Sequence, residues 1–255
     1  MNKEAIGIIG GMGPFAGNDL SGKIISQTRA SLDQEHLPQV LFSFPGEIND
    51  RTAFILGKVK ENPGNNIANI ILQMEKVGAT VAGLACNSAH APQIFDVITN
   101  ILKQQGSKIK LLHMIKQVAL FLRYYYPEVK KIGVLGTTGT QVTGLYEMLE
   151  DYDLENVNLT ESEQELLHSA IYDKEYGIKS GGSEVSEHAI TLLLGACRSL
   201  KTRGAGLLVF GCTEFPFAYK EPYAEGLPVI DSNMVLARAL IHEFAPEKLK
   251  PLKRT

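Results

Sequence analysis

Short apolar runs rich in β-branched residues alternate with longer segments of helical period along the chain. The apolar runs predict strands at residues 5–10, 39–44, 80–85, 109–112, 131–136, 206–211 and 227–230. The segments between them predict helices at residues 16–31, 65–77, 90–104, 113–125, 141–150, 161–176, 184–202 and 233–243. Strands that alternate with helices in this way pair in parallel and are covered by helices on both faces. The alternation therefore predicts the α/β fold class.

An internal repeat divides this pattern into two halves. The segment IGIIGGMG at residues 6–13 reads like IGVLGTTG at residues 132–139. The apolar run that ends on Cys86 likewise reads like the run that ends on Cys212, and both pairs are 126 residues apart. We therefore expect two pseudo-symmetric domains, each with a parallel-rich sheet flanked by helices. Ligands of such sheets bind outside the carboxyl ends of the strands, so we expect the active site in the crevice between the domains.

The predicted strands also suggest where the two domains meet along the chain. The first domain is expected to comprise residues 1–112 and 228–255 and to carry Cys86. The second domain is expected to comprise residues 113–227 and to carry Cys212. A chain of 255 residues is long enough for two domains of ordinary size.

Charge and composition argue against several classes of partner. The formal net charge of -3 supplies no basic surface for nucleic acid or anionic lipid. No apolar run approaches the roughly 18–20 residues that cross a bilayer, and the first residues lead into a strand pattern rather than a secretory signal. Of the cysteines, Cys197 lies on an apolar helix face and is expected to be a core residue. The remaining two form no Cys-x-x-Cys pair, so we expect free thiols, a cytoplasmic location, and no nucleic-acid or membrane partner.

Cys86 and Cys212 each stand where a buried strand ends and a helix is expected to begin. Because a helix N-terminus favours negative charge, we expect part of each thiol to be ionised. Three kinds of chemistry could use two such thiols in one crevice. A redox disulfide would lack the usual frame, and a metal site would need more ligands than the nearby His90, so no metal is expected. We favour proton transfer, in which one thiolate removes a proton from a carbon and the opposite thiol delivers one to the other face.

Several short segments together match a known pattern. They are IGIIGGMGP at 6–14, NDRT at 49–52, ACNSAH at 85–90, IGVLGTTGT at 132–140, GCTEFP at 211–216 and PVIDS at 228–232. With these segments the chain resembles the aspartate/glutamate racemase family, and within it the aspartate racemase branch. The resemblance implies an isomerase that interconverts L- and D-aspartate, or glutamate, without a cofactor. It also implies that Cys86 and Cys212 are the catalytic acid/bases, that the substrate is a small dicarboxylic amino acid, and that the protein is a homodimer.

The residues expected to bind the substrate lie near the two thiols or in the matching segments. They are Met12, Arg51, Thr52, Asn87, Ser88, Thr138, Lys179 and Thr213. Arg51 follows a predicted strand and a Pro-Gly break, so we expect it on a loop where its planar guanidinium could hold a carboxylate. His90 and Glu214, one turn beyond the thiols, could either tune a thiol or make a structural hydrogen bond.

Two alternatives stay open at the level of sequence. Gly11, Gly13 and Ala16 fit the glycine fingerprint of an NAD-dependent dehydrogenase. However, Pro14 removes a backbone N–H where a pyrophosphate should bind, and Asp33 precedes the strand whose end should carry the acidic residue. The other alternative is a non-catalytic amino-acid-binding protein, against which the retention of both thiols argues.

Overall fold

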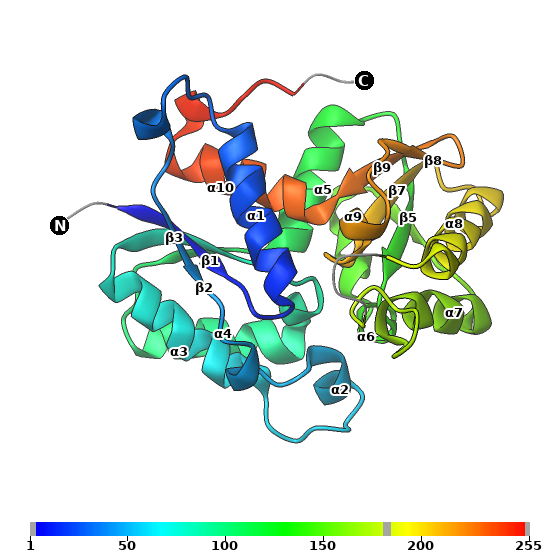
Figure 1. Ribbon diagram of the computed structural model, residues 1–255, viewed down its shortest axis with the longest axis horizontal. Coiled ribbons are helices and arrows are strands. Elements are labelled where there is room, and N and C mark those ends of the chain that lie inside the picture. Colours follow the sequence, from blue (N-terminus) through cyan, green and yellow to red (C-terminus); the bar gives the residue numbers. More distant parts are fainter. Residues whose placement is uncertain (1–3, 181–184, 253–255) are drawn as a thin grey trace. The chain divides into compact units, whose positions relative to one another are not determined.

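The computed structural model describes residues 4–180 and 185–252, and the chain divides into two compact units (Figure 1). The first unit comprises Met1–Gln117 and Asn233–Thr255, and the second comprises Val118–Ser232. One boundary falls inside helix α5 (Met114–Tyr125) and the other after the first residue of helix α10 (Ser232–Phe244). The second unit is therefore a continuous stretch of chain inserted into the first.

The first unit is built on a parallel sheet. Its strands are β1 (Ala5–Ile9), β2 (Gln39–Phe42), β3 (Ala79–Leu84) and β4 (Lys110–Leu112), in the order β2-β1-β3-β4. Every neighbouring pair is parallel. All residues of β1 are buried, as expected for a parallel strand that has helices on both of its faces.

Helices cover both faces of this sheet. A Cβ at Gly7 of β1 would lie 3.0 Å from Met74, whereas one at Gly83 of β3 would lie 3.0 Å from Leu236 and Leu240. Gly7 is the register partner of the residue before Gly83, so the two glycines point to opposite faces. One face is therefore covered by the helix of Met74 and the other by α10, and Figure 1 places α3 and α4 side by side. The helix of Met74 is α3 (Pro63–Lys76), α4 is Pro92–Gln104, and α1 (Pro14–Gln27) contacts β1 and β2.

The second unit is built on a sheet with the order β6-β5-β7-β9-β8. Its strands are β5 (Lys131–Gly136), β6 (Glu155–Val157), β7 (Leu207–Gly211), β8 (Tyr223–Ala224) and β9 (Leu227–Asp231). All pairs are parallel except β8 with β9, which are antiparallel. A Cβ at Gly133 would lie 3.0 Å from Leu200, so helix α8 covers one face, next to α7. A Cβ at Gly211 would meet the ring of Tyr146 at 3.2 Å, so a 3-10 helix covers the opposite face. The elements named here are α7 (Glu161–Tyr172), α8 (Glu187–Thr202) and the 3-10 helix Leu145–Tyr152.

The two sheets share one strand order. In each unit the first strand lies between the second and the third, and the third pairs on its other side with a later strand, β4 in the first unit and β9 in the second. The α/β class with parallel-rich sheets flanked by helices is therefore confirmed.

Irregular local geometry explains where the predicted elements differ from the observed ones. The helix expected at 141–150 is instead α6 (Thr138–Val142) followed by the 3-10 helix, because Gly144 has a φ of 58° and breaks the regular turn. Strands β6 and β8, with three and two residues, were too short to be predicted. Residue 184, the first residue of a predicted helix, lies outside the described residues. The same holds for residues 1–3, 181–183 and 253–255 of the predicted domains.

Candidate active site

The carboxyl edge of the first sheet brings a glycine turn beside Cys86. Strands β1 and β3 are parallel neighbours, and the N–H of Ala85 donates to the carbonyl of Ile9 at 3.1 Å, so the residues that follow both strands emerge together. Gly11 has a φ of 83°, and a Cβ there would lie 3.1 Å from the backbone nitrogen of Phe44. This turn therefore requires glycine. It places the buried Met12 at the same edge as Cys86.

Cys86 is buried among polar and apolar neighbours. Its side chain is 5% exposed, and its Sγ lies 3.5 Å from the Oγ of Ser88. Asn87 and Thr52 are buried as well. Helix α2 (Arg51–Ile55), which contains Thr52, packs against the 3-10 turn that contains Ser88. The residues expected to bind substrate in the first unit thus gather at one edge of its sheet.

Arg51 joins two segments of that edge. Its Nη2 donates to the carbonyl of Met12 at 2.6 Å, and its Nη1 donates to the carbonyl of Asn49 at 3.2 Å. The expectation of a loop position is wrong, because Arg51 begins a short helix capped by Asp50, and the residue is only 5% exposed. Charged hydrogen bonds to backbone carbonyls hold the glycine turn to α2, so Arg51 has a structural role as well as the charge to bind a carboxylate.

His90 fixes the backbone of Cys86. It is 1% exposed, its ring stacks on Phe95, and the ring of His113 lies 4.9 Å away. Burial, reinforced by the charge of His113, lowers the pKa of His90 to about 3, so the imidazole is neutral near pH 7. The Nδ1 lies 2.9 Å from the Cys86 carbonyl, which can only accept, so a neutral His90 donates there. The structural hydrogen bond is thus the role that the geometry gives to His90.

A helical segment begins soon after each thiol, as expected, but it is short in both cases. Cys86 is followed by a 3-10 turn of three residues, and α4 begins only at Pro92. Cys212 is followed by α9 (Phe215–Ala218), which has four residues. The expected helix dipole is therefore weak at both thiols, because it is the sum of aligned peptides over several turns.

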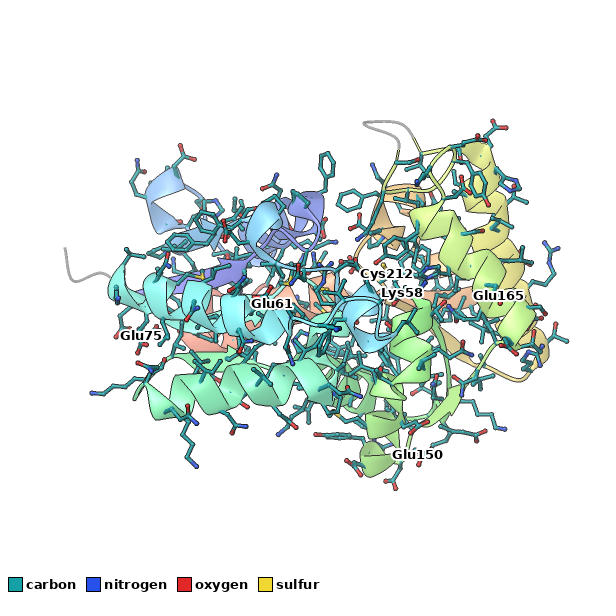
Figure 2. The ribbon with its side chains drawn as sticks, turned by 90° about the horizontal axis from the view of Figure 1, so that it is seen from below. Lys58, Glu61, Glu75, Glu150, Glu165 and Cys212 are labelled. Atoms are coloured by element: carbon teal, nitrogen blue, oxygen red, sulfur yellow. The ribbon has the colours of Figure 1, made fainter. Side chains whose placement is uncertain are left out.

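The second unit places Cys212 in a comparable position. Gly136 of β5 is the register partner of Gly211 of β7, so the residues after both strands emerge at one edge. Cys212 and Thr213 are 7% and 3% exposed. Of the two residues of this unit labelled Cys212 and Glu165 in Figure 2, Cys212 is buried and Glu165 is exposed. Each unit thus carries one buried thiol at the carboxyl edge of its sheet.

A set of polar and aromatic contacts begins at Glu214, two residues after Cys212. The Nζ of Lys179 lies 3.6 Å from Oε1 of Glu214 and 4.9 Å from the ring centroid of Tyr172. Tyr172 stacks on His168 with ring centroids 4.7 Å apart, and the N–H of Thr138 donates to Nδ1 of His168 at 3.3 Å. The structure therefore links Thr138, Lys179 and Glu214 on the side of the second sheet that carries Cys212.

Tyr146 is a residue near Cys212 that sequence reasoning missed. It is 1% exposed, and its ring packs against Gly211, the residue before Cys212. Burial, together with the charge of a Cys212 thiolate, raises the pKa of Tyr146, and Ser232 makes a hydrogen bond to its side chain. Tyr146 is therefore a neutral group beside this thiol. An aromatic residue in an amphipathic segment gives no signal that distinguishes it from an ordinary core residue.

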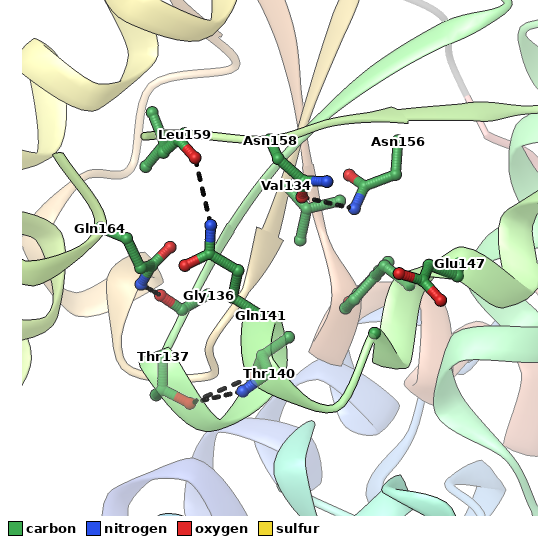
Figure 3. A pocket seen from close by; sticks show the side chains of 12 residues that line it. Val134, Gly136, Thr137, Thr140, Gln141, Glu147, Asn156, Asn158, Leu159 and Gln164 are labelled. Carbon is green, nitrogen blue, oxygen red and sulfur yellow. Dashed lines mark hydrogen bonds between the residues drawn. The ribbon is translucent and has the colours of Figure 1, made fainter. Parts of the chain in front are cut away.

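A small cavity lies behind the turn that follows β5 (Figure 3). Its volume is about 30 Å³, enough for one or two water molecules and too small for an amino acid. Around it, Nε2 of Gln164 donates to the carbonyl of Gly136 at 3.0 Å, and Nε2 of Gln141 donates to the carbonyl of Leu159 at 3.1 Å (Figure 3). These bonds hold the turn that contains Thr138 in place.

Cys197 is a core residue, as expected. It is fully buried in α8, and burial raises its pKa to about 12. All three cysteines are free. Among the described residues there is no group of three His, Cys, Asp or Glu side chains that could hold a metal ion. No helix in the described ranges is long and apolar enough to cross a membrane.

Comparison with known proteins identifies the family. The sequence profile described as Asp/Glu/Hydantoin racemase matches residues 9–240. The chain belongs to the Asp/Glu/Hydantoin racemase family. As a member of this family the protein is an isomerase, and the family match leaves the dehydrogenase alternative without support.

Solved structures of racemases resemble this member of the Asp/Glu/Hydantoin racemase family over nearly its whole length. An aspartate racemase from Picrophilus torridus is 30% identical, with a TM-score of 0.79 over 97% of this chain and 96% of that one. An aspartate racemase homologue from Pyrococcus horikoshii is 25% identical, with a TM-score of 0.69 over 94% and 99%. A glutamate racemase from Francisella tularensis, in complex with D-glutamate, is 15% identical with a TM-score of 0.67 over 99% and 86%, and shares the fold.

Proposed function

We propose that the protein racemises aspartate and that Cys86 and Cys212 are its two bases. The observation that carries the proposal is that each unit has one buried thiol at the carboxyl edge of its sheet, next to the turn after the neighbouring strand. The 30% identity to an aspartate racemase supports aspartate as the substrate. Racemisation needs one base on each face of the α-carbon, and a chain with two such thiols can supply both.

The proposed reaction balances without an added reagent. One thiolate takes the α-proton, so an S–H bond forms as the C–H bond breaks, and the electron pair is delocalised into the α-carboxylate. The opposite thiol then gives its proton to the other face of the carbon, which inverts the stereocentre. The two thiols have exchanged protonation states and are ready for the reverse direction. No cofactor is needed in this scheme.

The polar groups at each edge suit a dicarboxylic amino acid. We assign Arg51 and Lys179 to the substrate carboxylates, because both carry a fixed positive charge close to a thiol-bearing turn. The neighbouring Thr52, Asn87, Ser88, Thr138 and Thr213 are assigned to the α-carboxylate and amino group, and Met12 to the apolar part. Glutamate differs from aspartate by one methylene, worth only about 1–3 kcal/mol of discrimination, so it is the natural competitor.

The test follows loss of the α-proton of L- and D-aspartate in deuterated water, with racemisation measured in parallel. We expect Cys86→Ser and Cys212→Ser each to lower racemisation at least about 100-fold, because a hydroxyl is a far weaker acid or base than a thiol near pH 7. Each variant should still exchange the α-proton of one enantiomer, and the two variants should prefer opposite enantiomers. From the family resemblance, Cys86 should face the D form and Cys212 the L form.

Cys197→Ala is the matched control, because it removes a thiol from the core of the second unit. It should racemise aspartate like the parent for each folded molecule. A fully active Cys212→Ser protein, or equal residual exchange of both enantiomers in both variants, would contradict the two-base proposal. If glutamate is racemised and aspartate is not, the substrate assignment is wrong while the chemistry stands.

Two further parts of the proposal concern the state of the protein. We propose a homodimer, as in the family that the sequence resembles, to be tested by sedimentation at enzyme-assay concentrations. We also propose a reducing, cytoplasmic location, in which the free thiols would persist. Thiol titration of protein freshly extracted under alkylating conditions tests the second point.

A further inference from the structure

A buried carboxylate lies close to Cys212, and one cation is in contact with it. Glu214 has a side chain only 6% exposed, and its Oε1 lies 3.6 Å from the Nζ of Lys179, whose side chain is 26% exposed. A carboxylate buried to this extent needs a cation or several hydrogen bonds to remain charged. The position of Glu214 at the start of α9 does not explain why a carboxylate is buried here, because the Glu214 side chain makes no capping hydrogen bond to that helix.

Glu214 and Cys212 belong to the same turn. The N–H of Phe215 donates to the carbonyl of Cys212 at 3.3 Å, which closes the turn over Glu214. Two residues apart, their Cα atoms are separated by no more than about 7.6 Å, since consecutive Cα atoms are 3.8 Å apart. Both residues are buried, and charges of neighbouring residues in a buried turn are screened less than charges in water. A negative carboxylate therefore opposes the formation of a thiolate at Cys212 unless its charge is balanced.

We propose that Lys179 balances the charge of Glu214, so that this pair sets how readily Cys212 becomes a thiolate. Glu214 and Lys179 are then positioning residues for the thiol, and this role of Lys179 comes in addition to any contact with a substrate. Cys86 differs in its surroundings, because its Sγ lies 3.5 Å from the neutral hydroxyl of Ser88.

The position of the lysine cation is fixed by more than the carboxylate. Its Nζ lies over the ring of Tyr172, which stacks on His168, and His168 accepts a hydrogen bond from the N–H of Thr138. A cation over an aromatic face is attracted to it and loses little mobility when it also pairs with an anion. The ammonium group is therefore held at a constant distance from Glu214.

The other titratable groups near Cys212 do not balance the carboxylate. Tyr146 stays neutral because burial, followed by the charge of Cys212, raises its pKa. Asp231 at the end of β9 acts on the same tyrosine and adds a second negative charge on that side. Among the described residues, the ion pair recorded for Glu214 is the one with Lys179.

The experiment measures the pH midpoint for alkylation of Cys212 by iodoacetamide in a Cys86→Ser background, with the modified peptide identified by mass. Thiolate absorbance, taken as the difference from Cys86→Ser/Cys212→Ser, gives the same midpoint independently of reagent access. Glu214→Gln should lower the midpoint by about 1 pH unit, because an unopposed ammonium favours the thiolate. Lys179→Met should raise it by about 1 pH unit, because the carboxylate is then unopposed.

The double variant Lys179→Met/Glu214→Gln should return the midpoint towards that of the parent, and it removes the buried charge that could destabilise the single Lys179 variant. Lys131→Met is the matched control: it breaks another ion pair of this unit, 3.2 Å from Glu155, at the amino end of β5, and it should leave the midpoint unchanged. Shifts of the same sign in Glu214→Gln and in Lys179→Met, or no shift in Glu214→Gln, would overturn the inference.

The inference rests on the proposed function only in treating Cys212 as a working base, and the two can fail separately. Opposite shifts of the Cys212 midpoint in a protein that does not racemise aspartate would refute the proposed function and leave the inference about Lys179 and Glu214 standing. Racemisation of aspartate without these shifts would refute the inference about Lys179 and Glu214 and leave the proposed function standing.

Discussion

Helix α1 contains two glycines that provide a matched test of how closely the glycine turn is packed. A Cβ at Gly17 would lie 2.9 Å from the Cα of Gly10 and 3.2 Å from Leu41, whereas a Cβ at Gly22 would meet nothing within 4 Å. Both substitutions to alanine gain the same helix propensity, about 0.5–1 kcal/mol. The difference between the two variants therefore isolates the cost of the added methyl at Gly17.

That cost can be worked out from the contact. Carbon atoms pack best at about 3.5–4.0 Å, so a distance of 2.9 Å requires a shift of roughly 0.6 Å between α1 and the turn. Overpacking of this kind costs about 1–3 kcal/mol, and the upper half of the range is expected because the opposing atom is backbone. We expect Gly22→Ala to be slightly stabilising. Gly17→Ala should be about 2–3 kcal/mol less stable than Gly22→Ala.

Urea unfolding followed by circular dichroism measures this difference, and the thermal midpoints should differ by about 2–4 °C for each kcal/mol. Because Gly10 begins the turn whose Met12 carbonyl accepts from Arg51, Gly17→Ala should also slow racemisation, while Gly22→Ala should not. Equal stability of the two variants would refute the argument that this helix and turn are in contact through their backbones.

Two further predictions concern the first unit. The lowered pKa values of His90 and His113, about 3 and about 4, mean that the unfolded chain binds protons below pH 6.5 more readily than the folded protein, so stability should fall as the pH drops from 6.5 towards 4. A His90→Phe/His113→Phe variant should lose part of this slope in urea titrations at several pH values, and an unchanged slope would contradict it. Arg51→Met should abolish racemisation and also cost about 2–3 kcal/mol of stability, because charged hydrogen bonds to Met12 and Asn49 are lost. A variant as stable as the parent in the same unfolding assay would mean that these bonds contribute nothing.

The strands that could be predicted are those buried on both faces. β1 is an unbroken apolar run, and each of its residues is buried, so its sequence and its environment agree. β6 could not be predicted, because Glu155–Val157 is short and runs from exposed to buried within three residues. The 3-10 helix at Leu145–Tyr152 has an apolar spacing close to that of an α-helix, so only the backbone angle at Gly144 separates the two.

The two thiols could be found because the repeated motif marks them in the sequence. Their surroundings could not, because they depend on contacts between distant segments. Lys179 is 35 residues from Glu214, and Tyr146 packs its ring on Gly211, which is far along the chain and next to Cys212. The interpretation of Arg51 as a loop residue failed for the same reason, since its burial comes from hydrogen bonds to a turn 39 residues away.

The insertion of the second unit into the first affects how the protein emerges from the ribosome. Gly83 of β3, the strand that precedes Cys86, packs against Leu236 and Leu240 of α10, which are translated only after the whole of the second unit. Until then the nascent chain carries a sheet with one apolar face only partly covered, which is a substrate for chaperones and a site of aggregation. The second unit has no such delay, because Val118–Ser232 is a continuous segment. Translation arrested before residue 233 should therefore leave the first unit protease-sensitive while the second is already protected.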